Sequence, residues 1–440
     1  MKTTGAATSA AQKTRRTPRI FPGWYVVGGA MVIHFCVSVA FVYGFQAFFN
    51  PITQHFGWPR TVTAGAFSFQ RLEGGIVSPV AGFLVDRLGA RKMAVGGVFF
   101  IGLGLVALSQ IQEVWHYYLG FLVISVGMSA TFAGFPAAVV NWFRRLRGRA
   151  LGVMSSGPVP SGLFVPLVVI LIELIGWRNA LLFLGLAFLA MCLPAATFIR
   201  HAPEPYGYRP DGDPPEEGLP TGTVVMGADG AGPPVAVAST ATGLSIRQAL
   251  TSPAFWLLAL IFGVHQMGPG ALFVVQIPYF ESIGFSSASA ASTVGIFTVL
   301  SGIGRLGAGY LMDVIEREER LVVGLLAANA LGLFILVNIT GYWMVIPFAF
   351  FFGIAFGGMI PGRSILISEY FGTRNFASIQ GLINSVDVLF GIATPFLVGL
   401  SFDLTQSYKP AFIGIAALIA LAAPLPLLLR KPRTLSQSPL

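Results

Sequence analysis

Long apolar runs recur along almost the whole chain, and each of them is long enough to cross a lipid bilayer. Crossing about 30 Å of hydrocarbon takes about 20 apolar residues in a helix, because only helices and closed barrels satisfy their own backbone hydrogen bonds in lipid. Charged residues make up only 10% of the 440 residues, too few to cover a water-facing surface. The sequence therefore predicts an all-α membrane protein with twelve transmembrane helices. The predicted spans are residues 22–49, 60–86, 92–111, 115–141, 147–175, 178–200, 253–280, 287–313, 320–340, 342–369, 376–402 and 408–430.

One stretch interrupts this pattern between the sixth and the seventh run. Residues 201–250 are rich in proline and glycine and contain six acidic residues, a composition typical of a mostly disordered segment. Their last part, residues 244–250, is predicted to form a short helix at the membrane surface. The expected organisation is an N-terminal tail (1–21), a six-helix bundle (22–200), a linker (201–250), a second six-helix bundle (251–430) and a C-terminal tail (431–440).

Lysine and arginine gather in every second loop, and this bias sets the predicted orientation. One side of the membrane receives the basic N-terminal tail together with Arg87, Arg91, Lys92, Arg144, Arg145, Arg147, Arg149, Arg430, Lys431 and Arg433. The other side receives only Arg60, Arg178 and Lys409. Because loops rich in these residues stay in the cytoplasm, both termini and the linker are predicted to be cytoplasmic in a multi-pass protein of the cell membrane. The net charge of +9 comes from these short clusters, so we do not expect nucleic-acid binding.

A signature of a known family lies at the end of the second run. Residues 82–92 read GFLVDRLGARK and resemble the loop between spans two and three of the major facilitator superfamily. A partial repeat, GYLMD, closes the eighth run at residues 309–313. The resemblance implies a twelve-helix fold of that family. It also implies a conformational latch formed by Gly82, Asp86, Arg87, Gly89 and Arg91. The alternative is a positively charged loop that contains turn glycines.

Asp86 is the acidic residue of this predicted latch. It is expected to lie at the positive N-terminal end of a neighbouring helix. It is also expected to pair with Arg144 or Arg145, which follow the fourth run and complete the predicted latch.

A narrower resemblance begins at the end of the fourth run. Residues 142–152, WFRRLRGRALG, and Gly157 resemble the span-five signature of the monocarboxylate transporters and the related oxalate:formate antiporters. The chain has Trp142 where that family has tyrosine, Arg149 where it has leucine, and Ser161 where it has glycine. The resemblance implies a secondary active transporter of a small organic anion, a mono- or dicarboxylate. The anion would move with protons or in exchange for a counter-anion, by alternating access.

Two other functions remain open at this level. Residues 157–162, GPVPSG, partly resemble a span-five motif of drug:proton antiporters, which would imply efflux of an amphipathic compound. A transporter-like protein could instead sense a ligand and signal through the linker, although the linker is short and contains no folded domain.

Charged residues inside the predicted spans are the first candidates for function, because a charge at mid-bilayer costs about 2.5–3.5 kcal/mol. These residues are Arg71, Glu73, Arg305, Arg363 and Asp387. Three arginines against two acidic residues leave the interior positive, which favours an anion as the substrate.

Arg305 is the main candidate for substrate binding. A guanidinium group holds a carboxylate through two parallel hydrogen bonds and stays charged at physiological pH. Ser301 lies one turn earlier on the same helix face and is a second candidate. The monocarboxylate transporters carry an arginine at this position of span eight, and the resemblance implies the same role for Arg305. The alternative is a buried ion pair with Asp387 that only stabilises the C-terminal half.

Asp387 is the main candidate for proton coupling, because it lies on a polar stripe of the eleventh run. The stripe, at helical spacing, comprises Gln380, Asn384, Asp387, Gly391 and Thr394. A carboxyl group on this face could carry a proton, and the alternative is a structural ion pair with Arg305 or Arg363. Glu73 is the second candidate for proton coupling.

Several residues are weaker candidates for the substrate path. Arg71 shares a face with small residues that could equally form a packing seam. Spans one and seven line the cavity in the superfamily, which adds Tyr43, Gln46, Gln266 and Tyr279, although each of them could serve only in packing. Arg363 is expected to act as a gate or to pair with Glu369.

The sequence contains no enzyme motif. It lacks a nucleotide-binding loop, a metal-ligand spacing and a nucleophile with an organised base. We therefore expect no cofactor, no metal and no catalytic residue, and we expect a monomer whose two halves rock around a site at mid-membrane.

The orientation can be tested by labelling single cysteines in intact cells with a membrane-impermeant reagent. Cysteines placed in the linker or in either tail should react only after the membrane is opened, since the charge bias places these segments in the cytoplasm. A linker position that reacts from outside the intact cell would contradict this topology.

Overall fold

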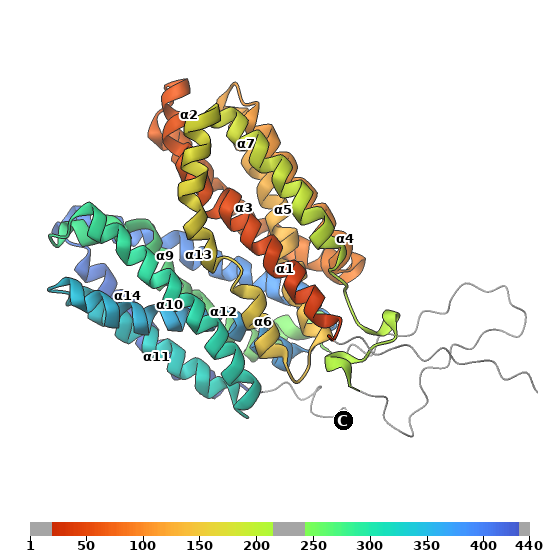
Figure 1. Ribbon diagram of the computed structural model, residues 1–440. Helices are drawn as coiled ribbons and strands as arrows, with labels where there is room; N and C mark the ends of the chain where they lie inside the picture. Colours follow the sequence, from red (N-terminus) through yellow and green to blue (C-terminus); the bar gives the residue numbers. More distant parts are fainter. Residues whose placement is uncertain (1–19, 214–242, 431–440) are drawn as a thin grey trace, which may run out of the picture.

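The computed structural model describes residues 20–213 and 243–430, and these residues are almost entirely helical. The predicted tails and the middle of the linker therefore lie outside the described residues. The helices form two halves, which come together at the end that carries the linker and diverge toward the opposite end (Figure 1).

The N-terminal half contains α1 to α7. Its helices are α1 (Gly23–Val37), α2 (Phe49–Phe56), α3 (Arg60–Leu88), α4 (Ala90–Ser109), α5 (Val114–Trp142), α6 (Arg147–Ser155) and α7 (Val165–Thr197). A π-helical turn (Ser38–Val42) and a 3-10 turn (Gly44–Phe48) connect α1 to α2. A further 3-10 segment (Val159–Phe164) connects α6 to α7, and Gly176, with a φ of 79°, makes the corner between spans five and six within α7.

The C-terminal half follows the short helix α8 (Ile246–Thr251). Its helices are α9 (Pro253–Ser282), α10 (Ser287–Val314), α11 (Glu318–Val337), α12 (Val345–Phe371), α13 (Phe376–Thr405) and α14 (Lys409–Ala422). A 3-10 turn (Leu425–Leu428) continues the last span.

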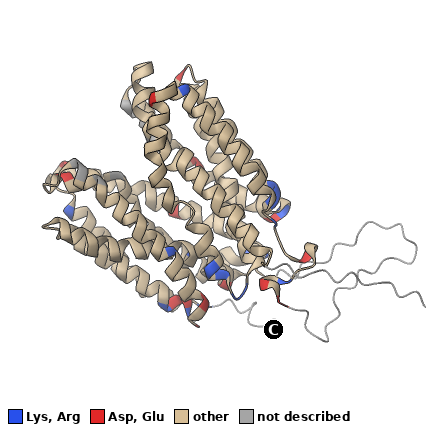
Figure 2. Ribbon diagram, in the orientation of Figure 1, with Lys and Arg blue, Asp and Glu red and all other residues tan. Residues whose placement is uncertain are grey.

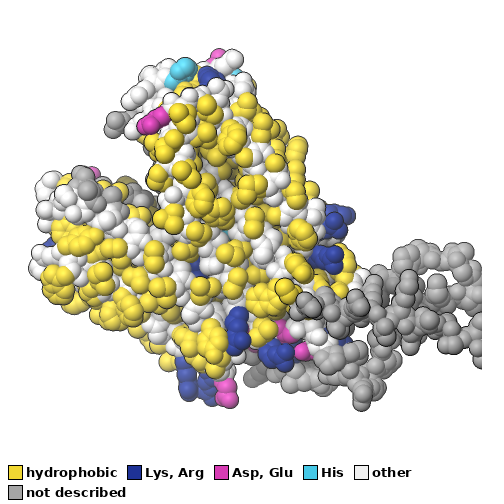
Figure 3. All heavy atoms as spheres, viewed as in Figure 1, with side chains coloured by type: hydrophobic (Ala, Val, Ile, Leu, Met, Phe, Trp, Pro, Cys, Tyr) yellow, Lys and Arg dark blue, Asp and Glu magenta, His cyan; other side chains and the backbone are white. Residues whose placement is uncertain are grey.

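The helices agree with the prediction of twelve spans. Within the described residues, ten segments are long and apolar enough to cross a membrane, and one of them, Arg147–Thr197, contains both span five and span six. Helix α3 does not reach this hydropathy, because it carries Gln70, Arg71 and Glu73 in its middle. Apolar side chains cover the flanks of both halves, as contact with lipid requires (Figure 3).

The halves are joined by two similar helix crossings, which we name the α3–α13 crossing and the α6–α10 crossing. In the first, the carboxylate of Asp86 accepts hydrogen bonds from the backbone N–H groups of Ala377 (3.2 Å) and Ser378 (2.8 Å). In the second, the carboxylate of Asp313 accepts hydrogen bonds from the N–H groups of Gly148 (2.5 Å) and Arg149 (2.9 Å). Each aspartate therefore caps the N-terminus of a helix in the other half, where the helix dipole favours negative charge.

Glycines let the helix backbones approach closely at both crossings. A methyl group at Gly82 would collide with the carbonyl oxygen of Ala377, and one at Gly309 would collide with the carbonyl oxygen of Gly148. Gly82 and Gly309 each lie one turn before the capping aspartate of their helix. The partial repeat seen in the sequence thus corresponds to a repeated contact.

The predicted pairing of Asp86 with Arg144 or Arg145 is wrong. Asp86 is satisfied by the start of α13, whereas Arg144 and Arg145 face the linker. Their backbone N–H groups both donate to the carboxylate of Asp211, at 2.9 Å and 2.6 Å, and the guanidinium of Arg145 pairs with Asp213 at 3.2 Å. Of the other predicted latch residues, Gly82 and Arg87 lie in α3, Gly89 lies between the helices and Arg91 lies in the first turn of α4. Lysines and arginines gather at this end of the molecule (Figure 2).

Both described ends of the linker pack against the helix bundles. His201 Nδ1 accepts a hydrogen bond from the N–H of Ala90 at 3.3 Å, and burial lowers the pKa of His201, which keeps this nitrogen free to accept. Helix α8, Ile246–Thr251, covers most of the short helix predicted for residues 244–250, and its start is closed by reciprocal hydrogen bonds between Ser245 and Gln248.

The α6–α10 crossing predicts a specific effect of one methyl group. Gly309→Ala should push the two helices apart, because overpacking costs about 1–3 kcal/mol, and this shifts the ratio of two conformations about tenfold. Spin labels on the exposed residues Lys92 and Arg317, at the linker end of opposite halves, should report a longer distance.

Gly307→Ala is the matched control, since no atom outside its own helix lies within 4 Å of an added methyl group there. An unchanged distance distribution in Gly309→Ala, or an equal change in Gly307→Ala, would contradict the role of this crossing.

Candidate functional site

A cavity of about 460 Å³ lies between the two halves. Helices α1, α3, α5 and α6 line it from the N-terminal half, and α9, α10, α12 and α13 line it from the C-terminal half. The surface is hollowed between the two halves at the end where they diverge (Figure 3).

The lining of the cavity is positively charged. Arg71, Arg305 and Arg363 line it, whereas Asp387 is the single acidic residue among the lining residues of the described chain. A cavity with three guanidinium groups and one carboxylate attracts anions, and it disfavours cations.

Arg305 is buried at the interface between the halves, with 8% of its surface exposed. Its guanidinium donates a hydrogen bond across the interface to the backbone carbonyl of Ser155, at the end of α6. Its Nε has no hydrogen-bond partner in the described part of the chain, and no acidic residue there pairs with it. His34 and Tyr43 of the first span lie close enough to interact with it electrostatically. A buried guanidinium group with unused hydrogen-bond donors can bind an anionic ligand.

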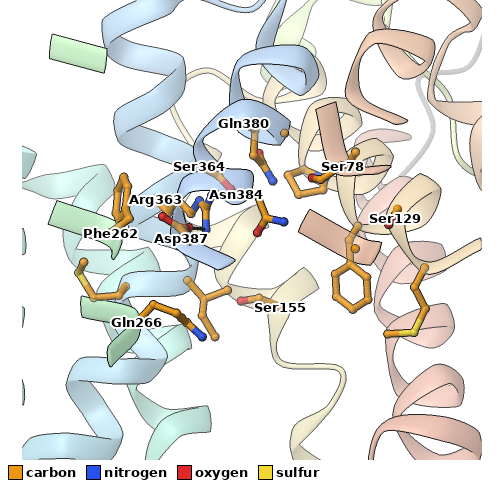
Figure 4. Close-up of a pocket in the computed structure, with 18 of the residues that line it drawn as sticks. Ser78, Ser129, Ser155, Phe262, Gln266, Arg363, Ser364, Gln380, Asn384 and Asp387 are labelled. Atoms are coloured by element: carbon orange, nitrogen blue, oxygen red, sulfur yellow. Dashed lines mark ion pairs between the residues drawn. The ribbon is translucent and has the colours of Figure 1, made fainter. Parts of the chain in front are cut away.

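Asp387 forms an ion pair with Arg363, which joins α13 to α12 (Figure 4). Asp387 is 4% exposed, and its second oxygen has no hydrogen-bond partner within the described residues. Arg363 also leaves Nε and one Nη without a partner there, and it lies over the ring of Phe262 at 5.5 Å. Both members of the pair thus keep unused hydrogen-bonding groups beside the cavity.

This ion pair is one of the two pairings predicted as alternatives for Asp387. The alternative pairing of Arg305 with Asp387 is not formed, and the predicted pairing of Arg363 with Glu369 is wrong. Residues six apart on a helix do not face each other, and Glu369 instead pairs with Arg147 of the other half at 3.2 Å.

The structure brings together four of the predicted substrate and coupling residues and places four others elsewhere. Arg71, Gln266, Arg305 and Asp387 line the cavity. Ser301 is buried against Gly357 of α12, and Tyr279 is 1% exposed and donates its hydroxyl to the carbonyl of Leu336 at 2.8 Å. Neither lines the cavity.

Two further predicted residues lie outside the lining, and a third has a side chain that the structure does not describe. Glu73 is 8% exposed, and neither of its carboxyl oxygens has a hydrogen-bond partner in the described chain. Tyr43 is half-buried near Arg305 but outside the lining, and the side chain of Gln46 lies outside the described part of the structure.

Sequence reasoning missed the serines and the sulfur and aromatic side chains of the cavity. Ser78, Ser129, Ser155 and Ser364 line it together with Met128, Phe132, Phe356 and Met359. Serine in a membrane helix often forms a hydrogen bond to its own backbone. Residue type alone therefore could not distinguish the serines that line the cavity from those that only bond to the helix. For Ser155 the signal was the pair Pro158 and Pro160, which interrupts the helix just after it.

The described residues offer no metal site. No group of three histidine, cysteine, aspartate or glutamate side chains able to hold a metal lies within residues 20–213 and 243–430.

Twelve membrane-spanning helices in two halves around a central cavity define a class of membrane transport proteins. Comparison with known protein families identifies the family within this class. The chain belongs to the Major Facilitator Superfamily, whose model matches residues 30–386 and, in a second match, residues 272–439.

Similar proteins agree with this assignment. The chain is 26% identical over 403 residues to monocarboxylate transporter 12 of Rattus norvegicus, covering 89% of this chain and 82% of that protein. It is 27% identical over 449 residues to monocarboxylate transporter 7 of Homo sapiens, covering 91% and 85%. The solved structure of the transporter FucP in its outward conformation superposes with a TM-score of 0.69 at 15% identity, covering 93% and 99%. The chain is therefore a transporter that resembles monocarboxylate transporters, and it is not an enzyme.

Proposed function

We propose that this protein carries a small organic anion, a mono- or dicarboxylate, across the cell membrane by alternating access. Transport would be coupled to protons or to exchange with another anion. The observation that carries this proposal is Arg305, a guanidinium that is 8% exposed, lines the central cavity and has no acidic partner among the described residues. The names of the similar monocarboxylate transporters support the same substrate class.

The charge of the cavity supports an anion over a cation. Because Asp387 neutralises Arg363, Arg71 and Arg305 are left as uncompensated positive charges in the lining. A carboxylate that enters the cavity would form charge-assisted hydrogen bonds, which are about twice as strong as those between neutral groups. Arg71 comes from the N-terminal half and Arg305 from the C-terminal half, so one anion could engage both halves.

The remaining lining supports an organic substrate. Phe132, Phe262, Phe356 and Met359 provide apolar walls beside the charged groups, as in other small-molecule sites. The hydroxyl and amide groups of Ser364, Asn384 and Gln380 stand on the same side as the Arg363–Asp387 pair, where they can orient a polar group (Figure 4).

The Arg363–Asp387 pair supports a route for proton coupling. When Asp387 takes up a proton, its attraction for Arg363 falls, and Arg363 becomes a third free cation beside the substrate path. The anion would then bind best together with a proton. When the proton leaves, the ion pair forms again and the anion is released.

The closed and open ends support a direction for the cycle. If the linker end is cytoplasmic, as the charge bias of the loops indicates, the structure represents an outward-open state. The two crossings must then separate to open the cytoplasmic end, which is the rocking motion of transporters built from two repeated halves.

The substrate class predicts the behaviour of Arg305 variants in proteoliposomes. Arg305→Lys should lose most carboxylate uptake, because an ammonium group cannot reproduce the paired hydrogen bonds of a guanidinium. Arg305→Ala should lose carboxylate binding by at least a hundredfold, since truncation leaves the substrate's charge unpaired. Arg317→Lys, an exposed residue outside the cavity, is the control.

A carrier of amphipathic cations would behave differently. If Arg305→Ala still bound and transported carboxylates at the level of the control, the proposed substrate class would be wrong. Efflux of an amphipathic compound would then become the leading alternative.

Proton coupling predicts a selective defect in Asp387→Asn. This variant should lose uptake driven by a pH gradient and keep anion exchange, because its side chain cannot gain or lose a proton. Asp403→Asn changes an exposed carboxylate on the same helix and should behave as the unsubstituted protein. Normal pH-driven uptake in Asp387→Asn would exclude this residue and direct attention to Glu73.

A further inference from the structure

The end of α6 carries a backbone carbonyl that its own helix leaves unused. In a continuous helix the carbonyl of Ser155 would accept a hydrogen bond from an N–H three or four residues later. Residue 158 is proline and has no N–H group, while the N–H of Val159 donates to Ser156 at 3.0 Å. The Ser155 carbonyl is therefore left without a backbone donor, beside the cavity.

The missing donor is supplied from the other half of the molecule. Arg305 of α10 donates to the Ser155 carbonyl, and Ser155 itself lines the cavity (Figure 4). The two helices are closely packed here, because a methyl group added at Gly152 would lie only 2.7 Å from the carbonyl oxygen of Arg305. The contact thus joins α6 to α10 directly above the crossing held by Asp313.

The α3–α13 crossing differs at the equivalent level. Counting one turn from Gly82 and from Gly309 places Ser78 where the other crossing has Arg305. That crossing is closed by a neutral hydrogen bond from the Ser385 hydroxyl to the carbonyl of Gly75, at 2.5 Å. Of the two crossings, as far as the described residues show, the α6–α10 crossing carries a charged group in its cavity-side contact.

We propose that the Ser155 carbonyl competes with the substrate for Arg305 and thereby couples substrate binding to the movement of the two halves. In the empty carrier, the guanidinium holds the end of α6 and keeps the linker end closed. A carboxylate offers a stronger acceptor than a neutral carbonyl, so it displaces Ser155 and releases α6 from α10. This inference rests on the proposed role of Arg305 as the anion site, and it assigns to Pro158 the task of keeping the carbonyl available.

The proposal makes Pro158 and Pro160 a matched pair of test positions. Pro158→Ala introduces an N–H three residues after Ser155, which can donate to the Ser155 carbonyl in a 3-10 turn and replace Arg305. Pro160→Ala introduces an N–H in the same interrupted segment, but its partners at the same spacing are Gly157 and Ser156. Both changes remove a proline constraint from the backbone, and only Pro158→Ala supplies an N–H donor to the Ser155 carbonyl.

Two measurements on the full-length protein test the proposal. Pro158→Ala should bind a carboxylate such as lactate or oxalate about tenfold more tightly, because the guanidinium no longer needs to leave an internal partner. Without substrate, spin labels at Lys92 and Arg317 should show a larger share of the conformation that is open at the linker end. Pro160→Ala should match the unsubstituted protein in both measurements.

Arg305→Ala provides a second route to the same answer, which does not depend on the fold tolerating a change at Pro158. This variant should also populate the open conformation without substrate, and adding Pro158→Ala to it should produce no further shift. Equal behaviour of the two proline variants, or an unshifted Arg305→Ala, would overturn the proposal. Normal carboxylate binding by Arg305→Ala would instead overturn the proposed substrate class, so the two failures are distinguishable.

Discussion

A guanidinium group buried between two helix bundles in a membrane needs an acceptor, because an unpaired charge in a low-dielectric interior is costly. Arg305 meets this need with the carbonyl of Ser155 on the opposite half. That carbonyl is available only because α6 ends there, at a proline two residues beyond a serine pair. We propose that a carboxylate replaces this contact between a permanent cation and a neutral dipole.

The rest of the contact between the halves is built around two similar crossings. Each crossing combines glycines that allow backbone contact with an aspartate that caps a helix of the other half. These contacts involve few side chains with many rotamers, so little side-chain entropy is gained or lost when they form. Arg147 adds an ion pair to Glu369 across the same end. The closed end is thus held by short, directional contacts, while the open end leaves the cavity accessible.

Helix number, the latch signature and the positive interior could be predicted from the sequence, because each depends on local composition or spacing. The pairing of charges could not. Asp86 was expected to pair with an arginine, but the start of α13 satisfies it, and no local pattern reveals which helix lies opposite. Likewise, the polar stripe placed Asp387 on a cavity face and left Arg305 and Arg363 as alternative partners, and only the packing of α12 on α13 selects Arg363. Tyr279 lies in span seven and was expected to line the cavity, but its hydroxyl donates a hydrogen bond to α11 instead.

The central claim is that the cavity recognises negative charge, and a comparison of ligand pairs tests it most directly. The thermal unfolding of the purified protein should be measured with carboxylates and with the primary amides of the same acids, which match them in shape and lack the charge. A carboxylate at a hundred times its Kd should add about 2.7 kcal/mol of stability, and its amide should add almost none. Equal stabilisation by the acid and its amide, or stabilisation by organic cations alone, would contradict the account.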